Sequence, residues 1–412
     1  MSPAAISAPR SEAAAAARAP GARSAGLLNL MLGDLARRDP DGIALRDQPE
    51  RATWSGRAAR VRSWAKLHED TGRLSVFLAG LRLDPGARVV VCLPNCSEGI
   101  LAVLALERAG LTPCLLPLVT EPGQVAATVE AVNARALITQ ALMGAERPAA
   151  DLAPVAAADF RLRFLLGFGP DLPDGVLDLD GVLEESGAVP ERPSGNAAPA
   201  MLTVAGGGRV VARSSASLVA AAAPVLAATG AKSRDRIASF VAADDLKGLA
   251  TGLAQALMSG ASLELYEVAS RAALENAVSA PGRLHLVLPG WAESALPSDT
   301  RPSGSLLFAS DAPVRLPGRH PAPAPTLHAV SLAETALLVF GEDRTQPPGS
   351  RPPFLDVEID PGGTIRTRGV GVVSEEDESG MAPTGAGTAL ASKWIQTDFR
   401  LEFEGGAVAG VA

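Results

Sequence analysis

The stretch Arg88–Leu118, RVVVCLPNCSEGILAVLALERAGLTPCLLPL, decides the fold class of this chain. It opens with an uninterrupted apolar run, of the kind that is buried on both faces of a sheet. Pro94-Asn95 ends this predicted strand, and a helical run follows that Gly110 terminates. A second apolar run begins at Thr112. Strand, helix and strand in this order are typical of a parallel sheet in an α/β fold.

The alternation continues on both sides of this stretch. Upstream, the pattern predicts a helix over Leu27–Arg38, strands over Ile43–Arg46 and Ala52–Trp54, and a helix that Ser55 caps and that continues toward Leu74–Leu81. Downstream, it predicts a helix over 122–133 and strands over 136–139 and 164–167.

A second unit with the same layout follows. Helices are predicted over 217–228, 244–260 and 271–278, and strands over 236–240, 262–266, 284–288 and 305–309. The last part turns to β-runs at 336–340, 356–359, 364–367 and 401–403. We therefore predict an α/β protein with two similar subdomains, residues 27–200 and 201–325, and a β-rich segment, residues 326–412. Residues 1–26 are rich in Ala, Pro, Ser and Arg without an apolar core, which predicts a disordered leader rather than a signal peptide.

The composition excludes several classes of protein. The 412 residues are 47% hydrophobic and 20% charged, as in globular proteins. The net charge of −8 argues against nucleic acid as a partner, because binding to phosphate backbones needs a basic face. No apolar run reaches the roughly 20 residues of a membrane-spanning helix.

Cysteine and histidine do not form a recognisable site in the sequence. Three cysteines in so long a chain indicate packed thiols in a reducing compartment, and hence a cytoplasmic protein. A metal site at Cys92 and Cys96 has no histidine near it in the sequence. The four histidines are scattered without metal or triad spacing, and each is expected to be exposed or satisfied by a neighbour: His68, His285, His320 and His328.

The stretch Met201–Leu218, MLTVAGGGRVVARSSASL, supplies the first candidate site. Two β-prone runs joined by Gly206-Gly207-Gly208 predict a hairpin with a permissive turn. Glycines also let backbone N–H groups turn toward an anion, so the same turn is a candidate phosphate cradle. The plain hairpin is the favoured interpretation.

The segment Arg73–Leu118 resembles the first α/β subdomain of the acyl-adenylate-forming synthetases, the family of acyl-CoA synthetases, adenylation domains and luciferases. The resemblance rests on order and spacing, with Pro94-Asn95 and Ala109-Gly110 where the family keeps Pro-Asn and Ala-Gly. It implies the fold of the large domain of acyl-CoA synthetases, ATP or AMP with Mg²⁺ as cofactors, and an acyl or aryl carboxylate as ligand. An apolar pocket would lie beside Leu246–Leu257 and the strand end at Ala309–Asp311, although that helix is equally typical of ordinary core.

The family's phosphate loop, Thr-Ser-Gly-Thr-Thr-Gly-x-Pro-Lys-Gly, is degenerate here. The chain has Thr203-Val-Ala-Gly-Gly-Gly-Arg209, which keeps one hydroxyl and replaces the lysine by arginine. The resemblance implies nucleotide contacts from Gly206, Gly207, Gly208 and Arg209. Arg209 is also the single candidate for a catalytic role.

Two further motifs are partly kept. The family's Tyr-Gly-x-Thr-Glu is Val-Ser-Leu-Ala-Glu at 330–334, so the resemblance implies that Glu334 helps to hold Mg²⁺. A lone glutamate at the start of a strand is more often solvent-facing, and that interpretation is slightly favoured. Trp394-Ile-Gln-Thr-Asp398 stands for Trp-x-x-Thr-Gly-Asp, so Asp398 is the implied acceptor for the ribose hydroxyls; a turn-capping role is the alternative.

The resemblance leaves two functions open. The family continues past this motif into a small C-terminal domain that carries a catalytic lysine, and we expect this chain, which ends at Ala412, to lack that domain. One function is a catalytically impaired or inactive homologue that binds a nucleotide, an acyl ligand or a protein partner, and that needs no cofactor. The alternative is a divergent ligase that adenylates a carboxylate with a C-terminal domain or partner in trans. The degenerate loop favours the first, while Glu334 and Asp398 keep the second open.

Overall fold

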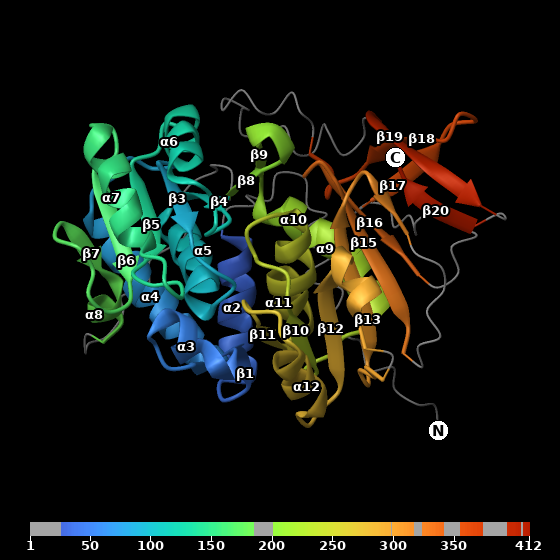
Figure 1. Ribbon diagram of the computed structural model, residues 1–412, viewed down its shortest axis with the longest axis horizontal. Coiled ribbons are helices and arrows are strands. Elements are labelled where there is room, and N and C mark those ends of the chain that lie inside the picture. The colour runs from blue at the N-terminus through green and yellow to red at the C-terminus, as the bar shows by residue number, and fades with distance from the viewer. Residues whose placement is uncertain are drawn as a thin grey trace, which may run out of the picture.

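The computed structural model describes residues 26–184, 201–297, 299–316, 324–341, 355–373, 394–404 and 407–412. The predicted leader, except for Gly26, and His320 lie outside these ranges. Figure 1 shows three sheets side by side along the long axis of the molecule.

The first sheet has seven strands and lies at the left of Figure 1. The pairing is parallel from one edge to β8, and antiparallel between β8 and β9 at the other edge. In spatial order the strands are β7 (Val176–Asp178), β6 (Phe164–Phe168), β5 (Ala136–Gln140), β3 (Arg88–Cys92), β4 (Thr112–Leu116), β8 (Met201–Val204) and β9 (Val210–Arg213).

The second sheet has eight strands and fills the middle of the molecule (Figure 1). It is parallel except for an antiparallel strand at each edge. In spatial order the strands are β16 (Ala336–Phe340), β15 (Thr326–Leu332), β13 (Ser305–Asp311), β12 (Leu284–Pro289), β10 (Arg236–Ser239), β11 (Ser262–Leu265), β1 (Ile43–Asp47) and β2 (Val61–Ser63).

The third sheet is small, antiparallel and close to the C-terminus. Its order is β14 (Val314–Arg315), β20 (Ala407–Val411), β19 (Ile395–Glu404), β18 (Thr364–Arg368) and β17 (Asp356–Ile359). Buried side chains of this sheet pack with Val330, Leu338 and Phe340 of β15 and β16, so the third sheet shares a core with the edge of the second.

A layer of helices shares one continuous core with the two larger sheets. It consists of α2 (Leu27–Arg38), α4 (Trp64–Gly80), α5 (Ser97–Ala109), α9 (Ser215–Thr229) and the continuous segment of α10 (Leu246–Gly248), a π-helical turn η3 (Leu249–Ala254) and α11 (Gln255–Ser259). The outer faces are covered by α6 (Pro122–Ala131) and α7 (Pro148–Ala158) on one side and α12 (Arg271–Ser279) and η4 (Gly290–Ala295) on the other. The short α8 (Leu179–Glu184) lies beside β6 and α4. The middle of α5, Ile100–Leu106, is entirely apolar and buried, which suits this central position.

The predicted fold class is confirmed, with local corrections. Ala52–Trp54 is not a strand, because it belongs to the short helix α3 (Ala52–Ser55), which follows the 3₁₀ turn η1 (Pro49–Arg51). Ser55 caps no helix; Ser63 caps α4 instead, its hydroxyl accepting the Lys66 N–H at 3.2 Å. The pattern missed β15 and α7, the latter because Pro154 interrupts its helical signal.

The sheets cross the predicted subdomain boundaries. β1 and β2 lie before residue 64 but pair into the second sheet, and β8 and β9 lie after residue 200 but pair into the first. β15 and β16, placed in the β-rich segment by the prediction, complete the second sheet. Local pattern cannot reveal such exchanges, because strand partners are chosen by tertiary packing.

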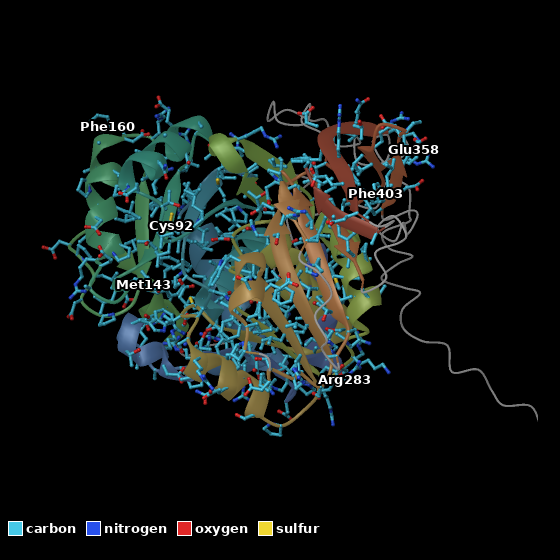
Figure 2. All side chains as sticks on the ribbon, turned by 45° about the vertical axis from the view of Figure 1, so that its right-hand side comes forward. Cys92, Met143, Phe160, Arg283, Glu358 and Phe403 are labelled. Atoms are coloured by element: carbon cyan, nitrogen blue, oxygen red, sulfur yellow. The ribbon has the colours of Figure 1, made fainter. Side chains whose placement is uncertain are left out.

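The three cysteines are buried, as predicted. Cys92, Cys96 and Cys114 are free thiols with at most 2% of their surface exposed. Figure 2 shows Cys92 deep among the side chains, whereas Phe160 and Phe403 lie at the periphery. Burial raises the pKa of all three thiols, so they are poor nucleophiles. None of the helices described in the structure is long and apolar enough to cross a membrane.

A buried ion network fastens α5 to the second sheet. The Glu98 carboxylate is fully buried and accepts the Arg51 guanidinium at 2.5 Å, with Arg57 at 3.2 Å and Arg62 at 3.6 Å. Asp47 of β1 caps α5 by accepting the Ser97 N–H at 2.8 Å and the Ser97 hydroxyl at 2.9 Å. Burial alone would raise the pKa of Glu98, but the three arginines lower it well below its usual range.

Asn95 makes a second joint between the two large sheets. Its side-chain amide donates to the carbonyl of Ser239 at 3.0 Å and to that of Tyr266 at 3.2 Å, at the ends of β10 and β11. Its N–H donates to the Glu267 carboxylate at 2.6 Å. The Pro-Asn pair therefore does more than end a strand.

Candidate functional site

The glycine stretch forms the predicted hairpin. β8 and β9 pair antiparallel, with Thr203 opposite Val211 and Val204 opposite Val210. Gly207 and Gly208 have φ values of 76° and 81°, a region that residues with a side chain rarely adopt. A Cβ at any of the three glycines would meet nothing within 4 Å, so the turn is open to solvent.

A second turn, between β15 and β16, faces this hairpin. Ala333 and Glu334 both have positive φ, 45° and 66°, and such residues cost free energy unless their surroundings hold them. Two arginines of the glycine hairpin stabilise this turn by hydrogen bonds. Arg209 donates to the Ala333 carbonyl at 2.8 Å, and Arg213 donates to the Glu334 carbonyl.

The interpretation of Glu334 as a solvent-facing residue is wrong. The turn directs its side chain inward, and the residue is 3% exposed. Its Oε2 accepts the Leu246 N–H at 2.7 Å and lies 3.6 Å from the Arg213 guanidinium, while its Oε1 accepts the Ser331 hydroxyl at 3.3 Å. Burial raises the pKa of Glu334, and Arg213 opposes that shift.

The residues that begin α10 add more charges beside Glu334. Asp245 caps the helix by accepting the Gly248 N–H at 2.8 Å. The Lys247 ammonium pairs with Asp245 and, at 2.7 Å, with Asp311 at the end of β13. Lys247 thereby ties the start of α10 to the carboxyl end of a parallel strand, where α/β proteins commonly bind ligands.

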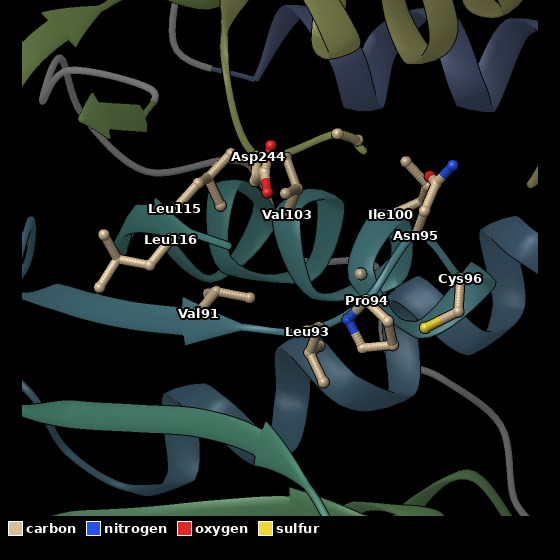
Figure 3. A pocket seen from close by; sticks show the side chains of 12 residues that line it. Val91, Leu93, Pro94, Asn95, Cys96, Ile100, Val103, Leu115, Leu116 and Asp244 are labelled. Carbon is tan, nitrogen blue, oxygen red and sulfur yellow. The ribbon is translucent and has the colours of Figure 1, made fainter. Parts of the chain in front are cut away.

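Asp244 lines a small pocket between the two larger sheets (Figure 3). The pocket has a volume of about 20 Å³, which is room for about one water molecule. Asn95 and Asp244 are polar groups of its lining. The apolar side chains of its walls come from β3, β4, α5 and the residues that follow β3: Val91, Leu93, Ile100, Val103, Leu115 and Leu116.

The structure places Asp398 away from these contacts. It lies exposed within β19, so the turn-capping alternative is wrong. Within the described residues, no hydrogen bond or ion pair joins it to the glycine hairpin or to Glu334. The neighbouring Thr397 hydroxyl donates to the Ile365 carbonyl at 2.9 Å, and Trp394 stacks under the guanidinium of Arg368, 4.4 Å from the ring centroid.

Comparisons with known proteins show a family similarity in the first half of the chain. The family model of AMP-binding enzymes matches residues 34–207. A salicyl-AMP ligase (salicyl-S-ArCP synthetase) from Mycobacterium tuberculosis is 31% identical over 203 residues, which are 47% of this chain and 33% of that protein. Residues 34–207 of this chain are therefore similar to the AMP-binding enzyme family. The segments that match curated relatives span a third or less of those proteins' length.

Solved structures of the family share the fold. Apo MbtA from Mycobacterium smegmatis matches with a TM-score of 0.72 at 21% identity, over 97% of this chain and 78% of that one. The O-succinylbenzoate coenzyme A synthetase from Bacillus subtilis, in complex with ATP and magnesium ion, matches with a TM-score of 0.68 at 16% identity, over 93% of this chain and 98% of that one. The resemblance predicted from Arg73–Leu118 is confirmed for the fold, and the family model matches the part of the chain that contains this segment.

The residues around Glu334 do not fit the divalent metal ion that the family resemblance implies there. Mg²⁺ requires about six oxygen ligands in near-octahedral geometry. Both Glu334 oxygens already accept hydrogen bonds from the protein, and the Arg213 guanidinium lies against one of them. No cluster of three or more His, Cys, Asp or Glu side chains with metal-binding geometry occurs within the described ranges.

Two features escaped the sequence analysis. Arg213 was given no role, although a buried arginine next to an apolar run is itself a signal of an ion pair. The helix at Leu246–Leu257 was left open between pocket wall and core. Leu246, Leu249 and Leu253 pack in the main hydrophobic core, as expected for an ordinary core helix.

The fold also assembles a Ser–His–Asp constellation that spacing did not reveal. His285 lies 2.9 Å from the Ser305 hydroxyl through Nδ1 and 3.2 Å from Asp235 through Nε2. Ser305 and His285 are each 1% exposed, so a substrate carbonyl has no access to the hydroxyl. Burial lowers the pKa of His285, which favours the neutral ring. The constellation links the starts of β10, β12 and β13, as expected for a satisfied histidine.

Replacing Asp244 with Asn is expected to remove a destabilisation of the fold that grows as pH rises. Burial, and then repulsion by Asp245, raise the pKa of Asp244 from 3.8 to about 7. A carboxyl whose pKa is higher in the folded state stabilises the fold fully below its unfolded pKa, and this contribution is lost as pH rises through the folded pKa. Urea denaturation should therefore show D244N more stable than the wild type at about pH 8, with the difference shrinking toward about pH 4. The exposed Asp151→Asn on α7 is the control, and a D244N difference that is the same at both pH values would contradict the raised pKa.

Proposed function

We propose that this chain is a catalytically impaired member of the AMP-binding enzyme family, which keeps the fold but does not adenylate carboxylates efficiently. The observation that carries this proposal is the direct contact between the glycine hairpin and the Glu334 turn. Arg209 and Arg213 join the two elements through the Ala333 and Glu334 carbonyls. The charges that would otherwise serve a bound nucleotide are used within the protein.

The chemistry of the hairpin supports the same conclusion. Catalysis of adenylation depends on donors that are placed in advance around developing charge, and the loss of one such donor typically costs about 10²–10³ in rate. The turn Gly206–Gly208 carries no side-chain donor, and Thr203 is fully buried. What remains for a nucleotide is the backbone of the open turn and the exposed carboxylate of Asp398. We propose that any ligand, whether nucleotide, acyl group or protein partner, is bound without efficient turnover.

A divergent active ligase is the second candidate. Two observations favour it: the relative that is 31% identical is a salicyl-AMP ligase, and the Asp398 carboxylate is exposed. This function would need ATP, Mg²⁺ and an aryl or acyl carboxylate, with the reaction completed by a C-terminal domain or partner in trans.

Titration of the purified chain by calorimetry, first with ATP and Mg²⁺ and then with AMP, separates the two candidates. We expect no salicylate-dependent exchange of pyrophosphate into ATP, and any heat measured with ATP and Mg²⁺ would then report binding without turnover. Micromolar binding of AMP that Asp398→Ala abolishes, together with exchange, would establish the ligase instead. Glu402→Ala, an exposed acid on the same strand, is the matched control.

A further inference from the structure

We infer that Arg213 is an internal cation that takes the place of a divalent metal ion at Glu334, so that this turn is held without metal. This inference rests on the proposed function, and it concerns the same turn. It explains how the chain keeps a buried glutamate where the family resemblance implies a metal ligand.

The first step is that both oxygens of Glu334 already accept hydrogen bonds from the protein. Oε2 accepts the Leu246 N–H at 2.7 Å, and Oε1 accepts the Ser331 hydroxyl at 3.3 Å. The Ser331 hydroxyl in turn accepts the Glu334 N–H at 3.3 Å. A metal ion would have to compete with these donors, which belong to β15 and to the start of α10.

The second step is that the Arg213 guanidinium lies beside the Glu334 carboxylate while it donates to the Glu334 carbonyl. The arginine side chain is 0% exposed, and Nη2 lies 3.6 Å from Glu334 Oε2. Its Nε and Nη1 have no hydrogen-bond partner among the described residues. Burying a charged guanidinium with unpartnered N–H groups costs free energy unless negative charge lies nearby. Glu334 and Asp245 supply that negative charge.

The third step is that the two cations exclude each other. A divalent ion on Glu334 would lie within a few ångströms of the Arg213 guanidinium, in surroundings where water screens charges poorly. Arg213 is the last residue of β9, and its guanidinium donates a hydrogen bond to the Glu334 carbonyl. The guanidinium cannot move away from Glu334 without breaking that hydrogen bond. The arginine and the metal are therefore alternatives at this position.

Binding of Mn²⁺ alone, followed by electron paramagnetic resonance of the free ion, tests this inference. Wild type and Glu334→Gln should bind Mn²⁺ equally weakly. Arg213→Met should gain affinity by roughly tenfold or more, because a unit positive charge beside the site is removed. The added Glu334→Gln change should abolish that gain. Arg209→Met, which changes the other arginine of the hairpin, is the control and should gain nothing.

Three results would overturn the inference. The first is Mn²⁺ binding by the wild type that Glu334→Gln weakens. The second is a folded Arg213→Met protein whose Mn²⁺ affinity equals that of the wild type. The third is a higher Mn²⁺ affinity in Arg213→Lys, which keeps the positive charge. If Arg213→Met does not fold, the wild-type, Glu334→Gln and Arg213→Lys results still decide. Because the assay contains neither nucleotide nor carboxylate, adenylation by the wild type would refute the proposed function without altering this result.

Discussion

Replacement of Glu98 with Ala is expected to lower the free energy of unfolding by about 3–5 kcal/mol, the usual cost of removing one partner from a buried ion pair. The change would leave Arg51 with Asp47, Arg57 with Asp180 and Arg62 with Asp70, each still buried or nearly so. Four arginines lie within 4 Å of the Glu98 carboxylate, which is the one group that they share: Arg51, Arg57, Arg60 and Arg62. Its loss therefore leaves positive charge that cannot reach water.

Urea denaturation measures this effect, and two further variants show where it comes from. Glu98→Gln keeps the shape of the side chain and should remain strongly destabilised, because the missing element is charge. Glu130→Ala removes a carboxylate that is 74% exposed and 3.8 Å from Arg161, and should change stability by less than about 0.5 kcal/mol. A Glu98→Ala protein within about 1 kcal/mol of the wild type would mean that the arginines find other partners or water.

The same network marks the limit of what the sequence could predict. Strands and helices with strong apolar periodicity, such as Arg88–Cys92 and the helix after it, were predicted nearly to the residue, because their signal is local. The short segment Ala52–Ser55 was assigned wrongly. Its structure is set by long-range partners of Arg51 and Arg57, which lie on α5 and α8, and no local pattern contains them.

The candidate site divides in the same way. The hairpin at Gly206–Gly208 was predictable, because the glycines and the flanking β-runs are contiguous. The direction of the Glu334 side chain was not, because it depends on two positive-φ residues and on arginines about 120 residues earlier in the chain. The nucleotide contacts implied for the glycine turn, Arg209 and Asp398 remain predictions.

Replacement of Gly248 with Ala is expected to destabilise the protein by at least about 3 kcal/mol, at the upper end of the effects of overpacking. A Cβ at Gly248 would lie 1.7 Å from the Ala242 carbonyl oxygen and 2.7 Å from its carbon, so backbone must move. The segment that must move carries Asp244 and Asp245, which line the pocket and cap α10. The change should therefore also disturb the charges beside Glu334.

Gly252, one helical turn further along the same helix, provides the matched comparison. A Cβ there would make ordinary contacts, 3.6 Å and 3.8 Å, with the two methyl groups of Leu263. Because alanine is favoured over glycine in helices by about 1 kcal/mol, Gly252→Ala should be neutral or slightly stabilising. Thermal and urea unfolding of the two variants should thus differ in sign. Equal losses would show that the helix tolerates no side chain at either glycine, and that the close approach at Ala242 is not what requires Gly248.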